Sequence, residues 1–404
     1  MPKNILFVIN TLSRAGAETA LLELLPCFFG PEWKVDLYVI LEQGELVDLV
    51  PRHVTLLNKR FSRESVLTGR GRVRMFFTVC RALISRGTMF RLFPYLVSSA
   101  FRMLGRGGLK VDKLCWRVLS DGAPRFSKEY DLAVAYIEGG SSYYVADHVN
   151  AKKKAAFIHV DYGMSGYDRK LDKDCFLKMD HIFPISEETQ KSFLEAYPEC
   201  EGKTSTFHNI VNQEVIREKA MLPGGFTDEY DGARILTVAR LTKQKAFPTA
   251  IDAMKLLKDA GVKARWYVLG EGDERGRLEQ KIRQLGLEKD FILLGAVGNP
   301  YPYYAQADLY VHATAYEGKS IAIQEAQTLA CPIITSDIIS NRQQVEDGVD
   351  GLVIAQKPEA LAKAIQELLN DPEKARRLGE NAAKRKFSYE KDLEGLFSLT
   401  SSRE

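Results

Sequence analysis

Short apolar runs alternate with candidate helices through the second half of this chain, and this alternation most narrows the folds open to it. Apolar runs of four to six residues, bounded by polar residues or glycine, are typical of strands buried on both faces. Strands that alternate with helices form parallel sheets with helices on both sides. The pattern therefore predicts an α/β domain with a doubly wound sheet. The predicted strands are 234–239, 264–269, 291–294, 309–313 and 332–335, and the predicted helices are 247–260, 274–285, 320–330 and 358–369.

The first half follows the same pattern and indicates a second α/β domain. Its predicted strands are 4–9, 35–41, 132–136, 154–158 and 181–184, with a helix at 18–25. A chain of 404 residues is too long for one ordinary core. We predict a first domain at 1–206 and a second at 207–387, with Leu222–Gly232 as a hinge. A C-terminal helix within 388–404 is expected to cross back to the first domain.

The segment Tyr316–Pro332 places two glutamates, Glu317 and Glu325, eight residues apart. Ser320 lies where its side chain can cap the following helix, whose first backbone N–H groups can then hold an anion. Glu325 falls roughly one and a half turns into this helix, near enough to accept hydrogen bonds from a ribose on the same ligand. Glu317, before the cap, faces the other end of the ligand. This arrangement suits a nucleotide joined to a sugar, although an ordinary capped helix with two exposed acids has the same spacing.

Cations and glycines follow two of the predicted strands, at the carboxyl ends where sheets of this kind bind ligands. Arg240 comes directly after one strand and Lys245 five residues later, so the pair can neutralise a diphosphate, or both can be ordinary solvated charges. Gly270 and Gly272 follow the next strand and allow backbone to approach a ligand closely. Their spacing is one residue off the dinucleotide-binding fingerprint, and no acid follows at the expected ribose position. Gly16 gives a flexible turn that can approach a phosphate or an acceptor, or simply join a strand to a helix.

These motifs occur in an order and spacing similar to those of a known family. They are Gly16-Ala17-Glu18, Arg240 with Lys245, Gly270-x-Gly272, and Glu317-Gly318 with Glu325-Ala326. Together they resemble the retaining GT-B glycosyltransferases of family 4, and the likeness covers nearly the whole chain outside 59–120. The segment EGKSIAIQEA, followed by Pro332 and Asp337, looks most like the branch that builds bacterial exopolysaccharide, capsule and lipopolysaccharide. The resemblance implies an α/β architecture of two doubly wound Rossmann-like domains that face a cleft.

The resemblance implies a role for each matched position. Arg240 and Lys245 bind the donor diphosphate and stabilise the departing nucleoside diphosphate. Glu325 holds the ribose hydroxyls, Glu317 contacts the donor sugar, and His159 lies near the anomeric carbon and steadies the sugar. Without the resemblance, His159 is better explained as a capping or core histidine. The expected catalytic residues are His159, Glu317, Arg240 and Lys245, and the expected donor-binding residues are Gly16, Arg240, Lys245, Gly270, Gly272, Glu317, Gly318, Lys319, Ser320, Ile321 and Glu325.

The resemblance also implies the reaction. A hexosyltransferase of this family moves a sugar from a nucleotide-sugar, here a UDP-sugar, to a hydroxyl of a lipid-linked or glycan acceptor and retains the anomeric configuration. The acceptor attacks on the face that the leaving phosphate vacates, so we expect no protein nucleophile, no cofactor and no essential metal. Asp172 and Asp174 look like the metal-binding Asp-x-Asp of another glycosyltransferase fold, and we interpret them as a solvated turn. Ala246, Lys319 and Ser320 replace the family's usual glycine, aromatic residue and glycine, which leaves the donor open.

The segment 59–120 is strongly basic. It has 14 Lys and Arg against two acids, a charge of +12 in a chain of net +3. Helices are predicted at 70–86 and 88–104, and the second carries apolar residues at helical spacing with Arg91, Arg102 and Arg106 around them. We expect it to lie on an anionic membrane surface. A helical hairpin packed on the first domain is the alternative, and nucleic acid is disfavoured because no base-reading module is visible. The apolar residues are Phe90, Phe93, Leu96, Val97, Ala100, Phe101 and Leu104.

Three other functions share part of this pattern. A glycoside hydrolase also uses two carboxylates but needs no Arg–Lys clamp on a diphosphate. An NAD-dependent oxidoreductase is disfavoured by the incomplete fingerprint, and a catalytically inert membrane-surface adaptor with the same fold remains an alternative. No apolar run approaches the ~20 residues that span a bilayer, and the six cysteines are scattered. We therefore expect a cytoplasmic protein that is peripheral on the inner face of the plasma membrane.

Overall fold

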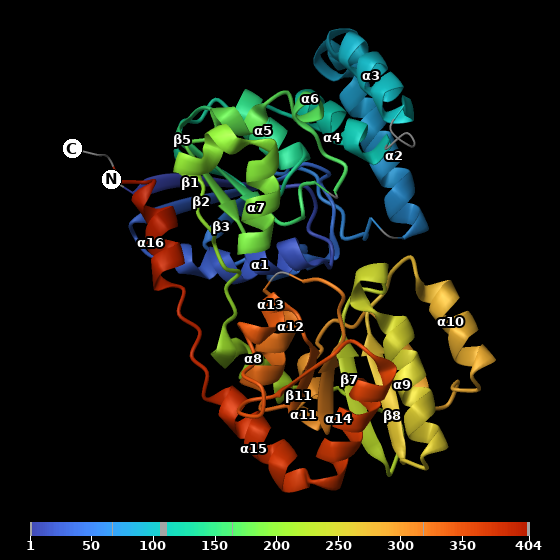
Figure 1. Ribbon diagram of the computed structural model, residues 1–404. Helices are drawn as coiled ribbons and strands as arrows, with labels where there is room; N and C mark the ends of the chain where they lie inside the picture. The colour runs from blue at the N-terminus through green and yellow to red at the C-terminus, as the bar shows by residue number, and fades with distance from the viewer. Residues whose placement is uncertain (1, 67, 106–110, 164, 318, 402–404) are drawn as a thin grey trace. The chain divides into compact units, whose positions relative to one another are not determined.

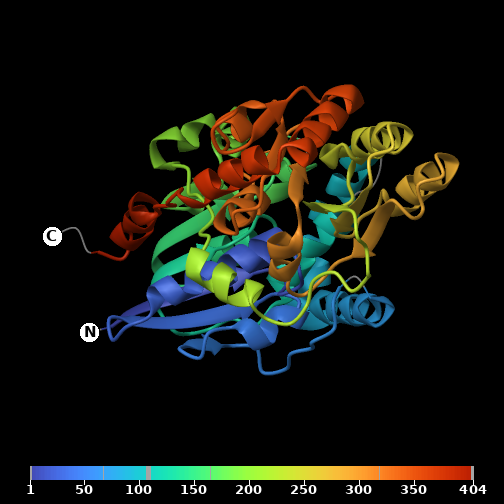
Figure 2. The same cartoon turned by 90° about the horizontal axis from the view of Figure 1, so that it is seen from below.

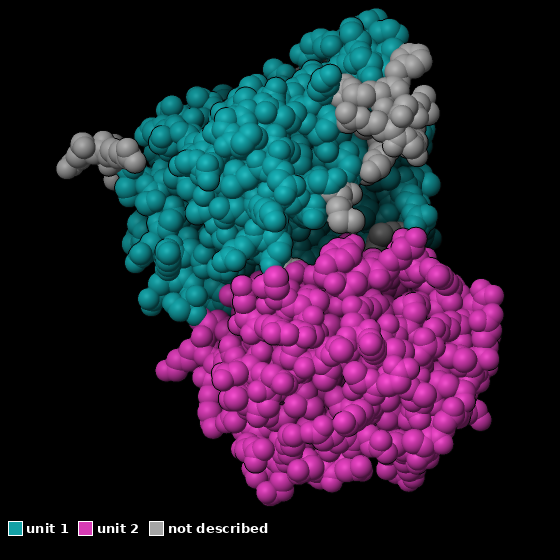
Figure 3. Space-filling model, viewed as in Figure 1, with its two compact units in different colours: residues 1–210, 388–404 teal, residues 211–387 magenta. Residues whose placement is uncertain are grey.

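The computed structural model describes residues 2–66, 68–105, 111–163, 165–317 and 319–401. The chain divides into two compact units (Figures 1 and 3), a first unit of residues 1–210 with 388–404 and a second unit of residues 211–387. The sequence predicts domain boundaries after residues 206 and 387, and in the structure the chain passes from one unit to the other after residues 210 and 387. Among the described residues, no helix is long and apolar enough to cross a membrane.

The first unit is built on a six-stranded sheet with the order β3-β2-β1-β4-β5-β6, and all of its strand pairs are parallel. The run Ile5–Ile9 of β1 is wholly buried, as expected for an apolar strand in the middle of a covered sheet. The chain runs outward from β1 to β3 and then returns to the other side of β1, so the strand order reverses between β1 and β4. The strands are β1 (Lys3–Ile9), β2 (Trp33–Val39), β3 (Val54–Leu56), β4 (Tyr130–Ala135), β5 (Ala151–Ile158) and β6 (His181–Pro184).

The last helix of the chain, α16 (Glu390–Ser398), packs within the first unit beside β2 (Figures 1 and 2). Phe397 stacks on Trp33 with ring centroids 5.3 Å apart and meets Phe28 edge-on at 5.1 Å. Asp392 accepts a hydrogen bond from the backbone N–H of His208 at 3.4 Å. These contacts tie the C-terminal segment to the first unit. The other helices around the first sheet are α1 (Gly16–Leu24), α5 (Gly140–His148), α6 (Arg169–Asp172) and α7 (Glu187–Ala196).

The basic segment forms the helices α2 (Gly69–Ile84), α3 (Thr88–Gly105) and α4 (Val111–Gly122). The first two were predicted and α4 was not. Ala82 and Leu92, with Val118 of α4, join the core of the first unit. A Cβ on Gly122 would lie 2.4 Å from the carbonyl oxygen of Ala82, so α4 and α2 pack at close range. The alternative prediction, a helical hairpin packed on the first domain, is therefore correct for one face of these helices.

The second unit repeats the arrangement with the strand order β12-β11-β10-β7-β8-β9, again all parallel. Its order reverses between β7 and β10. The predicted fold class, α/β with two doubly wound sheets, is confirmed. The strands are β7 (Ala233–Val238), β8 (Ala264–Leu269), β9 (Phe291–Gly295), β10 (Leu309–His312), β11 (Ile333–Ser336) and the unpredicted β12 (Leu352–Ile354).

The helices of the second unit pack in two groups. α9 (Phe247–Asp259) contacts α10 (Arg275–Gln284) and α14 (Pro358–Asn370), whereas α12 (Ile321–Thr328) contacts α8 (Gln213–Ala220), α11 (Tyr301–Gln306) and α15 (Pro372–Ala383). The short α13 (Ile339–Arg342) follows β11. The sheet core between them includes Trp266, Val311 and Ile334, which are fully buried.

Candidate active site

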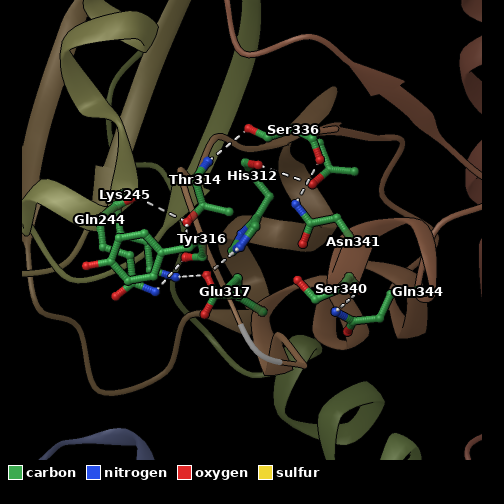
Figure 4. A network of polar contacts seen from close by, with 12 residues as sticks. Gln244, Lys245, His312, Thr314, Tyr316, Glu317, Ser336, Ser340, Asn341 and Gln344 are labelled. Carbon is green, nitrogen blue, oxygen red and sulfur yellow. Dashed lines mark hydrogen bonds and ion pairs between the residues drawn. The ribbon is translucent and has the colours of Figure 1, made fainter. Parts of the chain in front are cut away.

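Two loops meet at the strand-order reversal of the second sheet, and hydrogen bonds hold them together (Figure 4). β7 and β10 are neighbours, and the loops that follow them carry Gln244 and Tyr316. The backbone N–H of Ala315 donates to the carbonyl of Gln244 at 2.8 Å, and the Gln244 side chain donates to the carbonyl of Tyr316 at 2.7 Å. These bonds bring the next residue of each loop, Lys245 and Glu317, together.

Lys245 and Glu317 form a largely buried ion pair. The ammonium contacts Oε2 of the carboxylate, and the two side chains are only 12% and 15% exposed. Burial by itself raises the pKa of Glu317, but the hydrogen bond from His312 and the charge of Lys245 outweigh it and lower the pKa to about 2. Glu317 is therefore an anion at physiological pH. The structure joins two predicted residues that lie 72 apart in the sequence.

His312 is a site residue that the sequence analysis missed. It is the last residue of β10, is 2% exposed, and contacts Glu317 Oε2 through Nε2 at 3.1 Å. Its Nδ1 lies 2.9 Å from the hydroxyl oxygen of Tyr310. The one signal in the sequence is a histidine that ends an otherwise apolar strand, five residues before the predicted donor-binding residue Glu317.

Glu325 is held by two tyrosines of α11. Its Oε1 accepts from the hydroxyl of Tyr301 at 3.2 Å, and its Oε2 accepts from the hydroxyl of Tyr304 at 3.1 Å. Tyr304 is fully buried, and Glu325 itself is half-buried. Glu325 is therefore not the exposed acid of an ordinary helix, which was the alternative explanation of the Glu317–Glu325 spacing.

Ser320 directly precedes α12, but the expected side-chain cap is wrong. Its hydroxyl accepts no capping hydrogen bond, so the first turn of α12, which opens at Ile321, has no side-chain cap. Uncapped N–H groups at a helix start are what an anion site uses, although the helix start alone does not identify a ligand. Lys319 is half-buried before the helix, and Gly318 lies outside the described residues.

The glycines after β8 shape the segment that carries Arg240. A Cβ on Gly270 would lie 1.9 Å from the carbonyl oxygen of Ala239, and its φ of +151° favours glycine. A Cβ on Gly272 would lie 2.2 Å from the carbonyl oxygen of Leu241. Both glycines are thus required by the chain's own packing, a reason different from the close approach of a ligand that the sequence suggests. Arg240 is exposed and makes no ion pair with any described residue.

Ala246 begins the helix after Lys245 in a strained conformation. Its φ of +42° and ψ of +30° lie in the left-handed region, which costs a non-glycine residue about 1–2 kcal/mol. The backbone therefore keeps the conformation that suits the glycine of the resembled family, although the side chain is alanine.

Two predicted site residues belong to the first unit, and Gly16 is one of them. Gly16 opens α1, and a Cβ there would meet no described atom within 4 Å. Its own unit therefore does not require glycine. Glu18, in the first turn, is buried and accepts from the hydroxyl of Thr11 at 2.6 Å, and burial raises its pKa.

His159 follows β5, and its ring packs in an aromatic environment. Its ring centroid lies 5.2 Å from that of Tyr136, and its backbone N–H donates to Oε2 of the buried Glu138 at 3.0 Å. The residue as a whole is half-buried, but its Nε2 is buried without a hydrogen-bond partner among the described residues. Burial lowers the pKa of the imidazole to about 4, so it is neutral at physiological pH. These contacts are those of a core histidine, and a role at the anomeric carbon stays a prediction.

The interpretation of Asp172 and Asp174 as a solvated turn is wrong for Asp172. This carboxylate is buried and accepts hydrogen bonds from Tyr143 at 2.6 Å and from Tyr162, and burial raises its pKa to about 6. Asp174 does lie in a turn, where it pairs with Arg169 at 2.8 Å. Within the described part of the chain, no three His, Cys, Asp or Glu side chains gather as metal ligands do.

Comparison with known proteins finds a family match in the second unit. Residues 228–385 match the family described as Glycosyl transferases group 1. One relative, from Campylobacter jejuni, is 28% identical over 209 residues, which are 51% of this chain and 55% of that protein. Its name is N-acetylgalactosamine-N,N'-diacetylbacillosaminyl-diphospho-undecaprenol 4-alpha-N-acetylgalactosaminyltransferase. The poly(glycerol-phosphate) alpha-glucosyltransferase of Bacillus subtilis is 27% identical over 241 residues, 58% of this chain and 35% of that protein. The match thus spans about half of the first relative and about a third of the second.

The fold of the whole chain is shared with a solved structure. HepE of Anabaena in complex with UDP-glucose superposes with a TM-score of 0.63 and 16% identity, over 98% of this chain and 99% of that chain. An identity this low shows the fold alone. The chain has the GT-B fold, and residues 228–385 match the Glycosyl transferases group 1 family.

Proposed function

We propose that the chain is a retaining glycosyltransferase of family 4 that moves a sugar from a UDP-sugar to a hydroxyl of a lipid-linked or glycan acceptor in bacterial surface-polysaccharide synthesis. The observation that carries the proposal is the buried ion pair of Lys245 with Glu317, with the exposed Arg240 on the same loop as the lysine. The pair lies at the reversal of strand order, where open α/β sheets bind their ligands. Cations and a fixed carboxylate side by side suit a ligand with a diphosphate at one end and hydroxyls at the other.

Each side chain has a task in this proposal. Arg240 and Lys245 neutralise the donor diphosphate and the nucleoside diphosphate that leaves. Glu325, whose two oxygens each accept a hydrogen bond from a tyrosine hydroxyl, accepts from the ribose hydroxyls. Glu317 accepts from a hydroxyl of the donor sugar. For the first unit, the proposal assigns Gly16 to the donor phosphate and His159 to the donor sugar near its anomeric carbon.

Retention follows if the acceptor attacks on the face that the phosphate vacates. The bond between the anomeric carbon and the phosphate oxygen breaks, and the bond to the acceptor oxygen forms. The proton of the acceptor hydroxyl passes to the departing phosphate oxygen. The arginine and the lysine stabilise the charge of that phosphate, so the proposed reaction uses neither a cofactor nor an essential metal.

Similar proteins support the donor and acceptor classes. HepE is described in complex with UDP-glucose, which favours a uridine nucleotide on this fold. The Campylobacter jejuni relative is named for a diphospho-undecaprenol acceptor, which favours a lipid-linked one. The sugar and the linkage are not part of the proposal.

A thermal-shift panel with UDP, GDP, ADP and NAD tests the proposed function. A ligand that binds only the folded state raises the melting temperature by mass action. We expect UDP to raise it, and Arg240→Ala to abolish the rise. Arg283→Ala is the matched control, because Arg283 is an exposed arginine on α10. A rise with NAD alone, or with none of the four nucleotides, would contradict the proposal.

We further propose an anionic membrane surface as the partner of α2 and α3. Large apolar side chains on these helices are exposed, from 38% for Val97 to 85% for Phe90. A contiguous apolar surface on a water-exposed face marks an interaction site. The sequence analysis predicted the apolar surface on α3 but not the one on α2. Leu96 was predicted to belong to this surface, but it packs on the core of the first unit. The exposed residues are Val73, Phe76, Phe77 and Ile84 on α2 and Met89, Phe90, Phe93 and Val97 on α3.

Cations accompany this apolar surface on α2. Arg70, Arg72 and Arg74 lie in its first turns, which carry no acid and where the helix dipole disfavours cations. They make no ion pair with a described residue. Four other arginines of 59–120 are paired, so only part of the +12 charge is available to lipid. These pairs are Arg63–Asp48, Arg81–Glu42, Arg91–Asp121 and Arg117–Asp147. Docking through this surface would place the protein on the inner face of the plasma membrane.

A further inference from the structure

His312 connects the buried Tyr310 to Glu317, and its contact with Glu317 is drawn in Figure 4. Its Nδ1 lies 2.9 Å from the tyrosine hydroxyl oxygen, and its Nε2 lies 3.1 Å from Oε2 of the glutamate. The histidine is 2% exposed, and every other residue of β10 is apolar or aromatic. A histidine at this place thus links the interior of the sheet to the loop that carries the site.

The two partners fix the tautomer of His312. Glu317 is ionised and can only accept, so Nε2 carries the hydrogen. Burial raises the pKa of Tyr310 well above its ordinary value, so the phenol stays protonated and donates to Nδ1. Burial also lowers the pKa of His312, so the ring is neutral even beside an anion. The neutral imidazole of His312 therefore donates a hydrogen bond from Nε2–H to the carboxylate of Glu317.

Two donors, one on the loop after β7 and one at the end of β10, converge on one oxygen of Glu317. The ammonium of Lys245 and Nε2 of His312 both contact Oε2. No described residue donates to Oε1. The last torsion of a glutamate is broad, so a carboxylate without such contacts turns freely. Fixing Oε2 at two points directs Oε1 as well.

We infer that His312 is a positioning residue that holds Oε2 of Glu317 in place, so that Oε1 accepts a hydrogen bond from a hydroxyl of the donor sugar. The inference rests on the proposed function, because it takes the sugar of a nucleotide-sugar as the partner of Oε1. Lys245 cannot supply this anchoring alone, since the same ammonium also serves the diphosphate. His312 has no such second task and touches no substrate.

The packing behind His312 reaches the other predicted carboxylate. Tyr310 packs on Tyr304 with ring centroids 5.1 Å apart, and the Tyr304 hydroxyl donates to Glu325. The buried side chains thus support both carboxylates, but of Tyr304, Tyr310 and His312 only His312 contacts Glu317. A change at His312 should therefore act on the sugar end of the donor and leave the nucleotide end intact.

The affinities of the full-length protein for UDP and for UDP-glucose, measured by calorimetry, test this separation. We expect His312→Leu to leave the Kd for UDP unchanged and to weaken UDP-glucose about tenfold, since one oriented acceptor is lost. His312→Gln keeps an N–H donor and should recover most of the loss. Val311→Ala is the control, because Val311 is a buried neighbour outside the hydrogen-bond path. An unchanged UDP-glucose affinity in His312→Leu, or an equal loss in His312→Gln, would overturn the inference.

A second readout does not depend on any nucleotide. In the protein with ¹⁵N-labelled histidine, the signal of His312 is assigned by its absence in His312→Gln. We expect the neutral Nε2–H tautomer at physiological pH. The charged and titratable groups that face the ring are Lys245, Glu317 and Tyr310. An imidazolium or an Nδ1–H tautomer at this pH would overturn the inference, whereas failure of the wild type to bind UDP with the tautomer intact would count against the proposed function alone.

Discussion

The buried carboxylate of Glu317 makes the stability of the fold depend on pH. Its pKa of about 2 lies below the ordinary glutamate value of 4.5, so its ionisation stabilises the folded state above about pH 4.5. This contribution is lost as the pH falls towards about 2. We expect Glu317→Gln to lower the free energy of unfolding by up to about 3 kcal/mol at neutral pH and by less at about pH 3. Urea unfolding of both proteins at the two pH values measures the difference.

An exposed acid serves as the control for Glu317. Glu288 lies at the surface of the second unit, and Glu288→Gln should leave the unfolding free energy within about 0.5 kcal/mol at both pH values. A Glu317→Gln deficit that is equal at neutral and acidic pH would show that the carboxylate is not held as a paired anion.

Gly16 offers a direct test of close approach by the donor. A Cβ there meets no described atom within 4 Å, so Gly16→Ala should leave the melting temperature unchanged or slightly raised. If the donor phosphate approaches this backbone, the new methyl group should weaken UDP-glucose binding about tenfold or more. Calorimetric titration measures it, with Gly276→Ala on α10 as the control, since that site is equally open. Unchanged binding in Gly16→Ala would remove Gly16 from the site.

The residues that the sequence predicted and those it missed differ in a physical way. Lys245, Glu317 and Glu325 were predictable because a diphosphate and sugar hydroxyls demand cations and carboxylates. His312 and Tyr304 were not, because their contacts depend on which strands and helices become neighbours. Asp172 was misjudged for the same reason, since the tyrosine that buries it, Tyr143, lies 29 residues away.

At the scale of elements, α2 and α3 each have one packed and one exposed apolar face. We expect the double variant Phe76→Ser with Phe90→Ser to lose binding to vesicles that contain anionic lipid, because both rings are exposed and neither is needed by the core. Replacing Arg72 by Gln should weaken binding by the equivalent of about 1 kcal/mol at low salt. Vesicle sedimentation at two salt concentrations measures both effects.

A paired arginine gives the matched control for this surface. Arg63→Gln makes the same charge change, but Arg63 is bound to Asp48 at 2.7 Å. It should therefore alter vesicle binding less than Arg72→Gln does. Equal binding to neutral and anionic vesicles, or no loss in the double phenylalanine variant, would contradict membrane docking by α2 and α3.

Most strands were predictable to within a few residues, because short apolar runs bounded by polar residues or glycine mark buried strands. β8 was predicted at 264–269 and spans Ala264–Leu269. β12, with only three residues, was missed because so short a run does not stand out from its surroundings. α4 was missed although it packs on the first unit, and the predicted cap of α12 failed because capping depends on a local rotamer that residue type does not set.

At the scale of the whole molecule, both sheets reverse their strand order next to the strand that opens them. The alternation of strands and helices predicts two such sheets, but it does not give the order of the strands. That order places β10 beside β7 and so brings Lys245 to Glu317. The fold class was therefore predictable from the sequence, whereas the geometry of the site needed the structure.

Two compact units with separate cores should give two thermal transitions. Leu6→Ala, in the core of the first unit, and Ile334→Ala, in that of the second, assign the transitions, since both side chains are fully buried. The proposed donor-binding residues include Gly16 and His159 of the first unit and the diphosphate cations of the second. A donor that binds residues of both units should therefore affect both transitions, and one bound donor supplies at most about 2.7 kcal/mol of stabilisation in total at 100 times Kd.

Scanning calorimetry with and without UDP-glucose distinguishes the possible outcomes. In Arg240→Ala, UDP-glucose should raise the melting temperature of neither transition, because the diphosphate is no longer bound. In His159→Ala the first-unit transition should lose its response while the second keeps it. If UDP-glucose raises only the second-unit transition in the wild type, then Gly16 and His159 of the first unit do not bind the donor.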